Sequence, residues 1–383
     1  MKLTRTGVWS DIKRANGGFG GATLTWHSWP ARGCGYGIVF FHVAYVPAFT
    51  KPAFITLPPI FDHIVPILGN CVPLFFVISA FSLTYVHDKS VGQDSWIGPY
   101  LIKRIFRIGP LFWAMMVAYW FLWWWPPRHF IELLIINATF AFNFFPSTHE
   151  SVVAAGWSVR VEMPFYLAFP FILARVRRTR DAVIFLVVAG TISFASLFWL
   201  SGNPDYASKA FTSCIAMFAI GLLAYRCFMS WSDDAKPWSC VAFLVVASAM
   251  YLVSWHFPIF NGQFNPLFWS CAFGFLCVWQ AATPSRLLAN SVMQWLGERS
   301  FSIYLLHPLT INQLSIHDVY IWIWQSLEPT IGAWAYLPCV ALTLTIVLSL
   351  SALTYALIEK PGQKVGAAII AAFRTRSVSS AAA

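Results

Sequence analysis

Long apolar runs, each bounded by polar or charged residues, recur along the whole chain. Ten of these runs approach the roughly 20 residues that a helix needs to cross the hydrocarbon core of a bilayer. They cover residues 33–50, 64–86, 108–125, 157–174, 182–201, 209–225, 239–256, 264–282, 300–316 and 332–358. The pattern predicts an all-α polytopic membrane protein with about ten transmembrane helices.

An eleventh apolar run, 130–146, contains three polar residues, and its path decides the topology. Cytoplasmic loops carry an excess of lysine and arginine. If 130–146 does not cross the membrane and the N-terminus is cytoplasmic, 21 of the 25 basic residues face the cytoplasm. The exceptions are Lys51, Arg128 and Lys209, which face outward, and Arg160, which lies within a span. If it crosses, the basic loop 175–180 faces outward. We therefore expect both termini in the cytoplasm and an interfacial or re-entrant segment near 130–146.

The composition excludes a soluble fold of this size. Hydrophobic residues make up 58% of the chain and charged residues 10%, whereas soluble domains carry about 25% charged residues. The net charge of +10 follows from the cytoplasmic basic residues, so we expect no nucleic-acid partner. The eight cysteines show no CxxC and no clustering with histidine, so we interpret them as packing residues and expect no metal site.

Three regions follow from these patterns. Residues 1–31 contain no signal peptide, and the glycine-rich stretch 17–21 lacks the lysine of a phosphate loop, so we expect a flexible cytoplasmic segment. Residues 32–361 form the membrane domain. Residues 362–383 are expected to form a short basic cytoplasmic tail.

Few ionisable residues fall within the predicted spans, where such residues are costly and usually functional. His42 and His307 lie at similar depths from the cytoplasmic side, and Glu162 and Arg160 lie nearer the outer end of 157–174. Each has a structural alternative. His42 could pack between helices, Glu162 could pair with Arg160, and His307 could bind a carbonyl that Pro308 leaves without a partner.

Lys103, Arg104 and Arg107 form a basic cluster at the cytoplasmic end of span 108–125, and Arg32 lies at the same level. Such clusters often anchor the topology or contact lipid headgroups. The alternative is an anionic cytosolic ligand, because the arginine fork matches phosphate geometry.

Seven segments together resemble a known family. They are Arg32-Gly33 with the following helix to His42, PLFFVISAF (73–81), YLIKRIFRIGP (100–110), WSVRVEMPFY (157–166), FAIGL (218–222), LGERSFSIYLLH (296–307) and IEKP (358–361). In this order they are similar to the motifs of the acyltransferase-3 family of integral-membrane O-acyltransferases, over about residues 32–361. Nine residues separate Arg32 from His42, where the family usually has ten.

The resemblance implies transfer of an acyl group, usually acetyl, from cytoplasmic acyl-CoA to a hydroxyl of an envelope saccharide, glycolipid or secreted molecule. It implies a bacterial inner membrane location, with acyl-CoA as co-substrate and no permanently bound cofactor. By the family's motifs, Arg32 and His42 form the functional pair, and Glu162 is the motif glutamate. The same motifs imply that the CoA phosphates are bound by Lys103, Arg104 and Arg107, and we expect Arg32 to hold these phosphates with them.

A thioester is already activated, whereas an acceptor hydroxyl needs a base. We hypothesise that His42 is that base and that Glu162 orients an imidazole or the saccharide; alternatively, His42 carries the acyl group covalently. Two other functions stay open. A proton-coupled transporter or exporter would also use membrane-embedded His and Glu, although no repeat relates the halves of the chain. A non-catalytic family member would only bind a glycan.

Overall fold

The computed structural model describes residues 29–45, 54–92, 96–122, 130–145, 151–256, 264–283 and 290–381, together with Pro47. Within these residues the fold is helical and contains no strand. The expectation of a flexible segment 1–31 therefore falls almost wholly outside the described residues. Arg32 lies in the first turn of a helix, but its side chain is also outside the described part.

The helices follow one another along the chain with short connections. They are α3 (Trp29–Tyr45), α4 (Pro59–Leu68), α5 (Cys71–His87), α6 (Ile97–Leu122), α7 (Phe130–Ala138), α8 (Trp157–Arg175), α9 (Thr179–Trp199), α10 (Pro204–Lys209), α11 (Phe211–Ser230), α12 (Trp238–His256), α13 (Asn265–Ala282), α14 (Ser291–Glu298), α15 (Ser300–Ile316), α16 (Val319–Ile331), α17 (Tyr336–Thr354) and α18 (Lys360–Ala381). Short turns are η2 (Asp88–Ser90), η3 (Ala141–Phe144), η6 (Gly332–Ala335) and the π-helical η7 (Tyr355–Glu359).

Five helical stretches of the described residues are long and apolar enough to cross a membrane: Cys71–Ser90, Ile97–Leu122, Thr179–Trp199, Pro204–Ser230 and Val319–Thr375. Shorter apolar helices are Tyr36–Tyr45, Pro59–Leu68 and Trp238–Val253. These helices support an integral membrane protein. The expected ten spans and the cytoplasmic location of both termini stay predictions.

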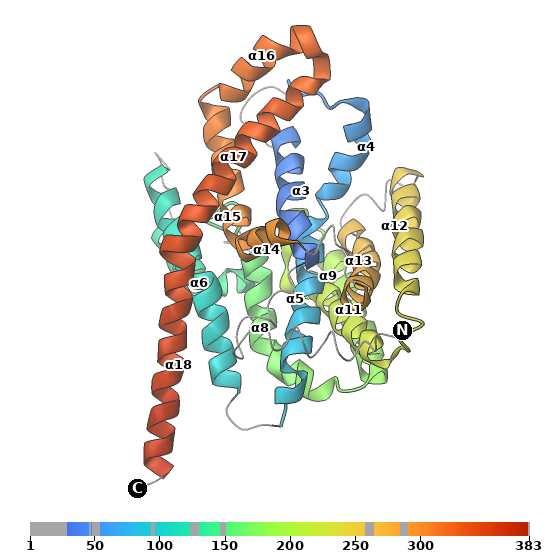
Figure 1. The fold of residues 1–383 in the computed structure, drawn as a ribbon, viewed down its shortest axis with the longest axis vertical. Coiled ribbons are helices and arrows are strands. Elements are labelled where there is room, and N and C mark those ends of the chain that lie inside the picture. The colour runs from blue at the N-terminus through green and yellow to red at the C-terminus, as the bar shows by residue number, and fades with distance from the viewer. Residues whose placement is uncertain are drawn as a thin grey trace, which may run out of the picture.

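Several elements differ from the expected ones. The run 64–86 is divided between α4 and α5, because Pro66 and Gly69 end the first helix before the second begins. The segment 130–146 is not one helix, since Phe140 adopts a left-handed conformation (φ 59°) between α7 and η3. Residues 362–383, expected to form a tail, are helical as far as Ala381. They belong to α18, which follows α17 and η7 without a break (Figure 1).

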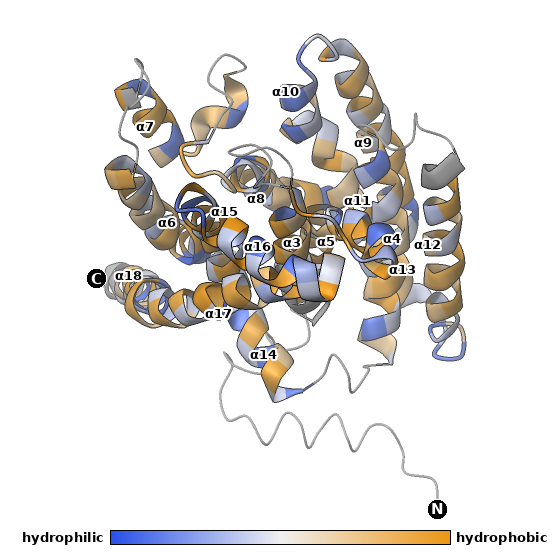
Figure 2. Cartoon of the chain, turned by 90° about the horizontal axis from the view of Figure 1, so that it is seen from above, coloured by the Kyte–Doolittle hydropathy of each residue, from blue (hydrophilic) through white to orange (hydrophobic). Residues whose placement is uncertain are grey.

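The middle of the bundle contains α3, α5, α8 and α15. Seen from above, α11 lies beside α5, and α6, α9 and α12 lie farther out and are largely hydrophobic (Figure 2). On the outer helix α9, Val187, Phe194 and Phe198 are all exposed, as expected for side chains that face lipid. His42, Glu162 and His307, discussed below, lie on the central helices.

Helices α5 and α11 approach closely at Gly221. A Cβ atom there would press against the Val77 carbonyl oxygen and lie 2.9 Å from Ala80 Cβ. Helices in membranes often pack by close approach at small residues. Lipid tails are as apolar as the side chains, so burial of apolar surface alone does little to hold two helices together.

Replacing Gly221 by alanine is expected to destabilise the fold by about 1–3 kcal/mol, because α5 and α11 must separate. Thermal unfolding of the purified protein in detergent measures this effect. Gly190, on α9, is the matched control, since a Cβ there meets nothing within 4 Å. Equal melting temperatures for Gly221→Ala and Gly190→Ala would contradict the prediction.

Candidate active site

His42 and His307 form a contacting pair between α3 and α15. The Nε2 atom of His307 lies 2.9 Å from Nδ1 of His42, and the ring centroids are 4.8 Å apart. His307 is fully buried, whereas His42 is partly exposed. Two residues that the sequence indicated separately thus belong to one site.

The surrounding carbonyl groups define the hydrogen-bonding role of each ring nitrogen. Nδ1 of His307 lies 3.3 Å from the Ile303 carbonyl oxygen, which can only accept, so this nitrogen carries a hydrogen. In the neutral ring, Nε2 of His307 then accepts, and Nδ1 of His42 must be the donor. The same Nδ1 of His42 also lies 2.9 Å from the Ile38 carbonyl oxygen. The lone pair of neutral His42 is therefore on Nε2, which is its basic nitrogen.

The structural alternative for His307 was a bond to the carbonyl that Pro308 leaves without a partner, which is that of Tyr304. The His307 Nδ1 atom lies 3.3 Å from the carbonyl oxygen of the preceding residue, Ile303. Its other nitrogen nevertheless reaches His42, so the residue does more than satisfy a carbonyl group near Pro308.

Both histidines line a cavity of about 570 Å³, which we call the histidine cavity. This volume is within the usual range for small-molecule sites. The walls come from α3, α5, α6, α7, α15 and the segment before α8. The other lining residues with polar side chains are Tyr119, Ser151, Trp157, Tyr304 and Asn312. Hydroxyl and amide groups beside a basic nitrogen suit a hydroxyl-bearing ligand.

A second cavity of about 230 Å³, the arginine cavity, contains Glu162, Arg104 and Arg107. Tyr166 donates a hydrogen bond to Glu162 Oε2 over 3.0 Å. We hypothesised that Glu162 orients an imidazole or the saccharide, but Glu162 and His42 line different cavities, and no contact joins them among the described residues. Glu162 is therefore not placed to orient the His42 imidazole. It shares its cavity with the two arginines instead.

The three residues of the basic cluster have different surroundings. Lys103, Arg104 and Arg107 all lie on α6, which begins well before the expected span. Arg104 and Arg107 line the cavity together, whereas Lys103 is exposed and is not among its lining residues. The Arg104 guanidinium lies about 6 Å from the ring centres of Tyr100 and Tyr166. Of the three residues, two are placed to meet a ligand in this cavity.

Glu359 is a residue of this region that the sequence interpretation did not single out. It ends the π-helical turn η7, its side chain is only 1% exposed, and it forms an ion pair with Arg107. Ser302 donates to its other carboxylate oxygen, and Thr354 donates to Ser302 over 3.1 Å. The terminal IEKP motif contained the signal, because a carboxylate that ends an apolar run needs a cation.

Arg160 does not pair with Glu162. It is fully buried and donates to the Lys209 carbonyl oxygen over 2.9 Å, and its guanidinium lies 5.6 Å from the Tyr206 ring centre. Asn143 in turn donates to the Arg160 carbonyl oxygen. Arg160 thus joins α8 to η3 and α10, away from both cavities, so its role in this structure is to connect these elements.

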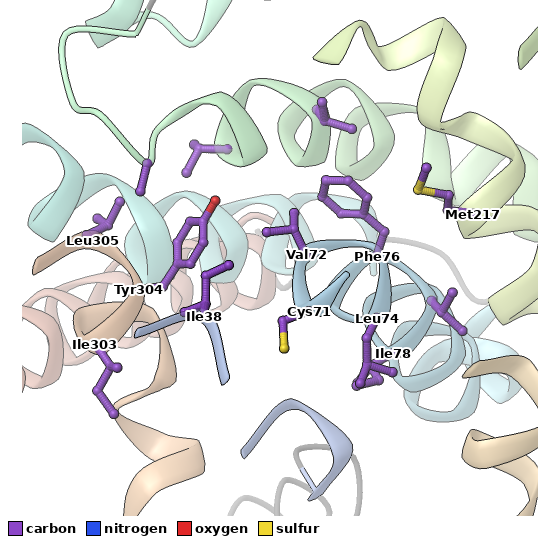
Figure 3. Close-up of a cluster of buried hydrophobic side chains, with 14 of the residues drawn as sticks. Ile38, Cys71, Val72, Leu74, Phe76, Ile78, Met217, Ile303, Tyr304 and Leu305 are labelled. Atoms are coloured by element: carbon purple, nitrogen blue, oxygen red, sulfur yellow. The ribbon is translucent and has the colours of Figure 1, made fainter. Parts of the chain in front are cut away.

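The two cavities are neighbours. Val72 of α5 and Tyr304 of α15 line both of them. Figure 3 shows these two side chains close to Ile38 of α3 in the buried core. The arrangement places a pair of arginines on one side of a shared wall and a pair of histidines on the other.

Comparison with known proteins agrees with this chemistry. The model of the acyltransferase-3 family, described as an acyltransferase domain, matches residues 34–352. No match was found among curated proteins or among solved structures. The matched region contains every residue of both cavities and excludes only the ends of the chain. The family indicated by the sequence motifs is thus confirmed, and the chain belongs to the acyltransferase-3 family of membrane acyltransferases.

Proposed function

We propose that this acyltransferase moves an acyl group, acetyl in the simplest case, from acyl-CoA to a hydroxyl of a saccharide of the cell envelope or of an exported saccharide. The observation that carries the proposal is the histidine pair beside an arginine-lined cavity with a shared wall. Arginine forks suit the phosphates of CoA, and a neutral imidazole suits a hydroxyl acceptor.

In the proposed reaction, Nε2 of His42 removes the acceptor proton as the hydroxyl oxygen attacks the thioester carbonyl carbon. A carbon–oxygen bond forms, the carbon–sulfur bond breaks, and the thiolate of CoA takes the proton back from His42. His307 accepts a hydrogen bond from Nδ1 of His42 throughout, which holds the ring orientation and stabilises the imidazolium. His307 is thus a positioning residue, and His42 is the catalytic one.

The two cavities are offset along the membrane normal in this proposal. Tyr119 of the histidine cavity and Arg104 of the arginine cavity both lie on α6. At 1.5 Å per residue they are roughly 20 Å apart along the helix axis. The bundle end nearer Arg104 contains the ion pairs of Asp88 with Arg226 and Arg177. Because basic residues gather on the cytoplasmic side, we place the arginine cavity toward the cytoplasm of a bacterial inner membrane. CoA then enters from inside, and the saccharide reaches His42 from the outer side.

Arg104→Ala is expected to raise the KM for acetyl-CoA. Loss of one charged hydrogen bond of about 1.5–3 kcal/mol corresponds to roughly a ten- to hundredfold weaker interaction. The measurement is steady-state transfer by the purified enzyme, with direct acetyl-CoA binding as a second readout. Lys103→Ala is the matched control, because Lys103 is exposed on the same helix. Unchanged acetyl-CoA binding by Arg104→Ala would contradict the donor site.

The acceptor is identified by comparing acylation of envelope and exported saccharides in a deletion strain and its parent. Restoration of the missing ester by the wild-type gene, but not by His42→Ala, would support the proposal. Identical saccharide acylation in deletion strain and parent would count against it.

A further inference from the structure

The Glu162 carboxylate is only half satisfied within the described part of the protein. Its Oε2 atom accepts the hydrogen bond from Tyr166, whereas no hydrogen bond or ion pair of Oε1 occurs among the described residues. The side chain is partly exposed and lines the arginine cavity. A carboxylate within a membrane span is costly unless its oxygens have partners. The remaining oxygen therefore points to a hydrogen-bond donor that arrives with a ligand.

Arg104 is open to a ligand in the same cavity. Among the described residues its guanidinium forms no ion pair and no hydrogen bond, whereas Arg107 is paired with Glu359. Tyr166 contacts Arg104 with its ring and Glu162 with its hydroxyl. The two charged groups attract each other across the cavity but form no ion pair. The cavity thus offers a cation and a hydrogen-bond acceptor as separate groups.

Glu162 lies between the arginines and the shared wall. One turn beyond it on α8 is Ser158, which also lines the arginine cavity and is hydrogen-bonded to Tyr304 of the wall. The next residue, Trp157, already lines the histidine cavity and is roughly 7–8 Å from Glu162 along the axis at 1.5 Å per residue. A ligand that extends from the arginines to the wall therefore passes Glu162.

The pantetheine arm of acyl-CoA has groups that match this order. With the phosphates at Arg104 and the thioester carbonyl at His42, the arm is the part that connects the two cavities. It carries one hydroxyl and two amide groups. The hydroxyl can both donate and accept, but an amide N–H only donates, so it needs an acceptor once it leaves water.

We propose that the free carboxylate oxygen of Glu162 accepts a hydrogen bond from an amide N–H of the pantetheine arm. This inference rests on the proposed function. Glu162 is then a donor-binding residue that fixes how far the arm enters the protein. The contact favours pantetheine thioesters over acyl phosphates, which offer a phosphate to Arg104 but no amide to Glu162.

The test measures binding, so that no acceptor is needed. The probes are acetyl-CoA and two analogues, in each of which an ester replaces one pantetheine amide and thereby removes one N–H. Isothermal titration calorimetry of the full chain in detergent micelles gives each Kd. For the wild type, one of the two analogues is expected to bind about ten- to hundredfold more weakly than acetyl-CoA, as for a hydrogen bond to a charged group.

Variants of Glu162 assign this preference to the carboxylate. Glu162→Leu keeps a similar size without an acceptor and should bind the three probes within about threefold of one another, since the coupling is lost. Glu162→Gln keeps a neutral acceptor and should show an intermediate preference. A wild-type preference in Glu162→Leu would overturn the inference. If that variant does not fold, a wild-type preference in Glu162→Gln would do the same.

Ser300→Ala is the matched control. Ser300 lines the same cavity, but its hydroxyl already donates to the Gly297 carbonyl oxygen. It should keep the wild-type preference, and a loss as large as in Glu162→Leu would overturn the inference.

Failure of the proposed function looks different. In that case acetyl-CoA does not bind to the wild type, or Arg104→Ala binds it unchanged. Binding that depends on Arg104, with no preference of the wild type for either amide, would overturn the role of Glu162 alone.

Discussion

His42→Ala is expected to lower the kcat of acyl transfer by about 10²–10⁴-fold, the usual contribution of a general base. The KM for acyl-CoA should change little, because the proposed phosphate contacts lie in the other cavity. The assay is transfer at saturating donor, with the melting temperature as a check on folding. Near wild-type kcat would exclude both the base and the carrier role of His42.

Variants of His307 test the positioning argument. His307→Ala removes one of the two acceptors that face Nδ1 of His42, the other being the Ile38 carbonyl oxygen. It is expected to lower kcat by about one to two orders of magnitude, since a charge-assisted hydrogen bond contributes about 1.5–3 kcal/mol. His307→Gln can present an amide oxygen near the same place and should recover part of the loss. If His307→Ala and His307→Gln are equally impaired, the hydrogen bond is not what His307 supplies.

The base and carrier roles of His42 predict different labelling of the protein when no acceptor is present. Incubation with radiolabelled acetyl-CoA should leave no stable label on the protein if His42 is a base, because no bond to the protein forms. Label that appears on wild type and is lost in His42→Ala would instead identify a covalent intermediate.

Much of the fold class was readable from hydropathy, because spanning helices need long apolar runs. Helix ends were less readable. The span of α6 was expected from residue 108, yet the helix begins at Ile97, since its first turns are amphipathic and pack against the bundle through Tyr100. Helix α16 was not expected, because Gln325 and Glu328 interrupt its apolar pattern.

The site was predictable residue by residue but not as an arrangement. His42 and His307 were each marked by being ionisable within a span, but 265 positions separate them, and helical periodicity says nothing about which helices meet. The division of the basic cluster was not readable, since Arg107 lies within about 60° of both Lys103 and Arg104 on an α-helix, and only the packing of α6 decides which pair lines the cavity. For Glu359 the IEKP motif indicated a buried carboxylate but not its partner, because the π-helical turn that carries it departs from the 3.6-residue period.

Arg107→Ala is expected to destabilise the protein more than Glu359→Gln, although both break the same ion pair. Glu359 is 1% exposed, so removal of Arg107 leaves a buried carboxylate with Ser302 as its remaining partner, at a cost of about 3–5 kcal/mol. The Arg107 side chain is 29% exposed and also donates to the Glu298 carbonyl oxygen. It can therefore hydrate when Glu359 is neutralised, and about 1–2 kcal/mol is expected.

The double variant Arg107→Ala/Glu359→Gln distinguishes stability from donor binding. Because it removes both charges, it should recover part of the stability lost in Arg107→Ala, with a coupling energy of about 1–3 kcal/mol by denaturant unfolding in mixed micelles. It should not recover the KM for acetyl-CoA, since the cation that borders the arginine cavity is still missing. Additive stability losses would show that the ion pair is not formed in the folded protein. Recovery of both stability and KM would show that Arg107 serves the fold alone, and that Arg104 is the arginine of this cavity that binds the donor.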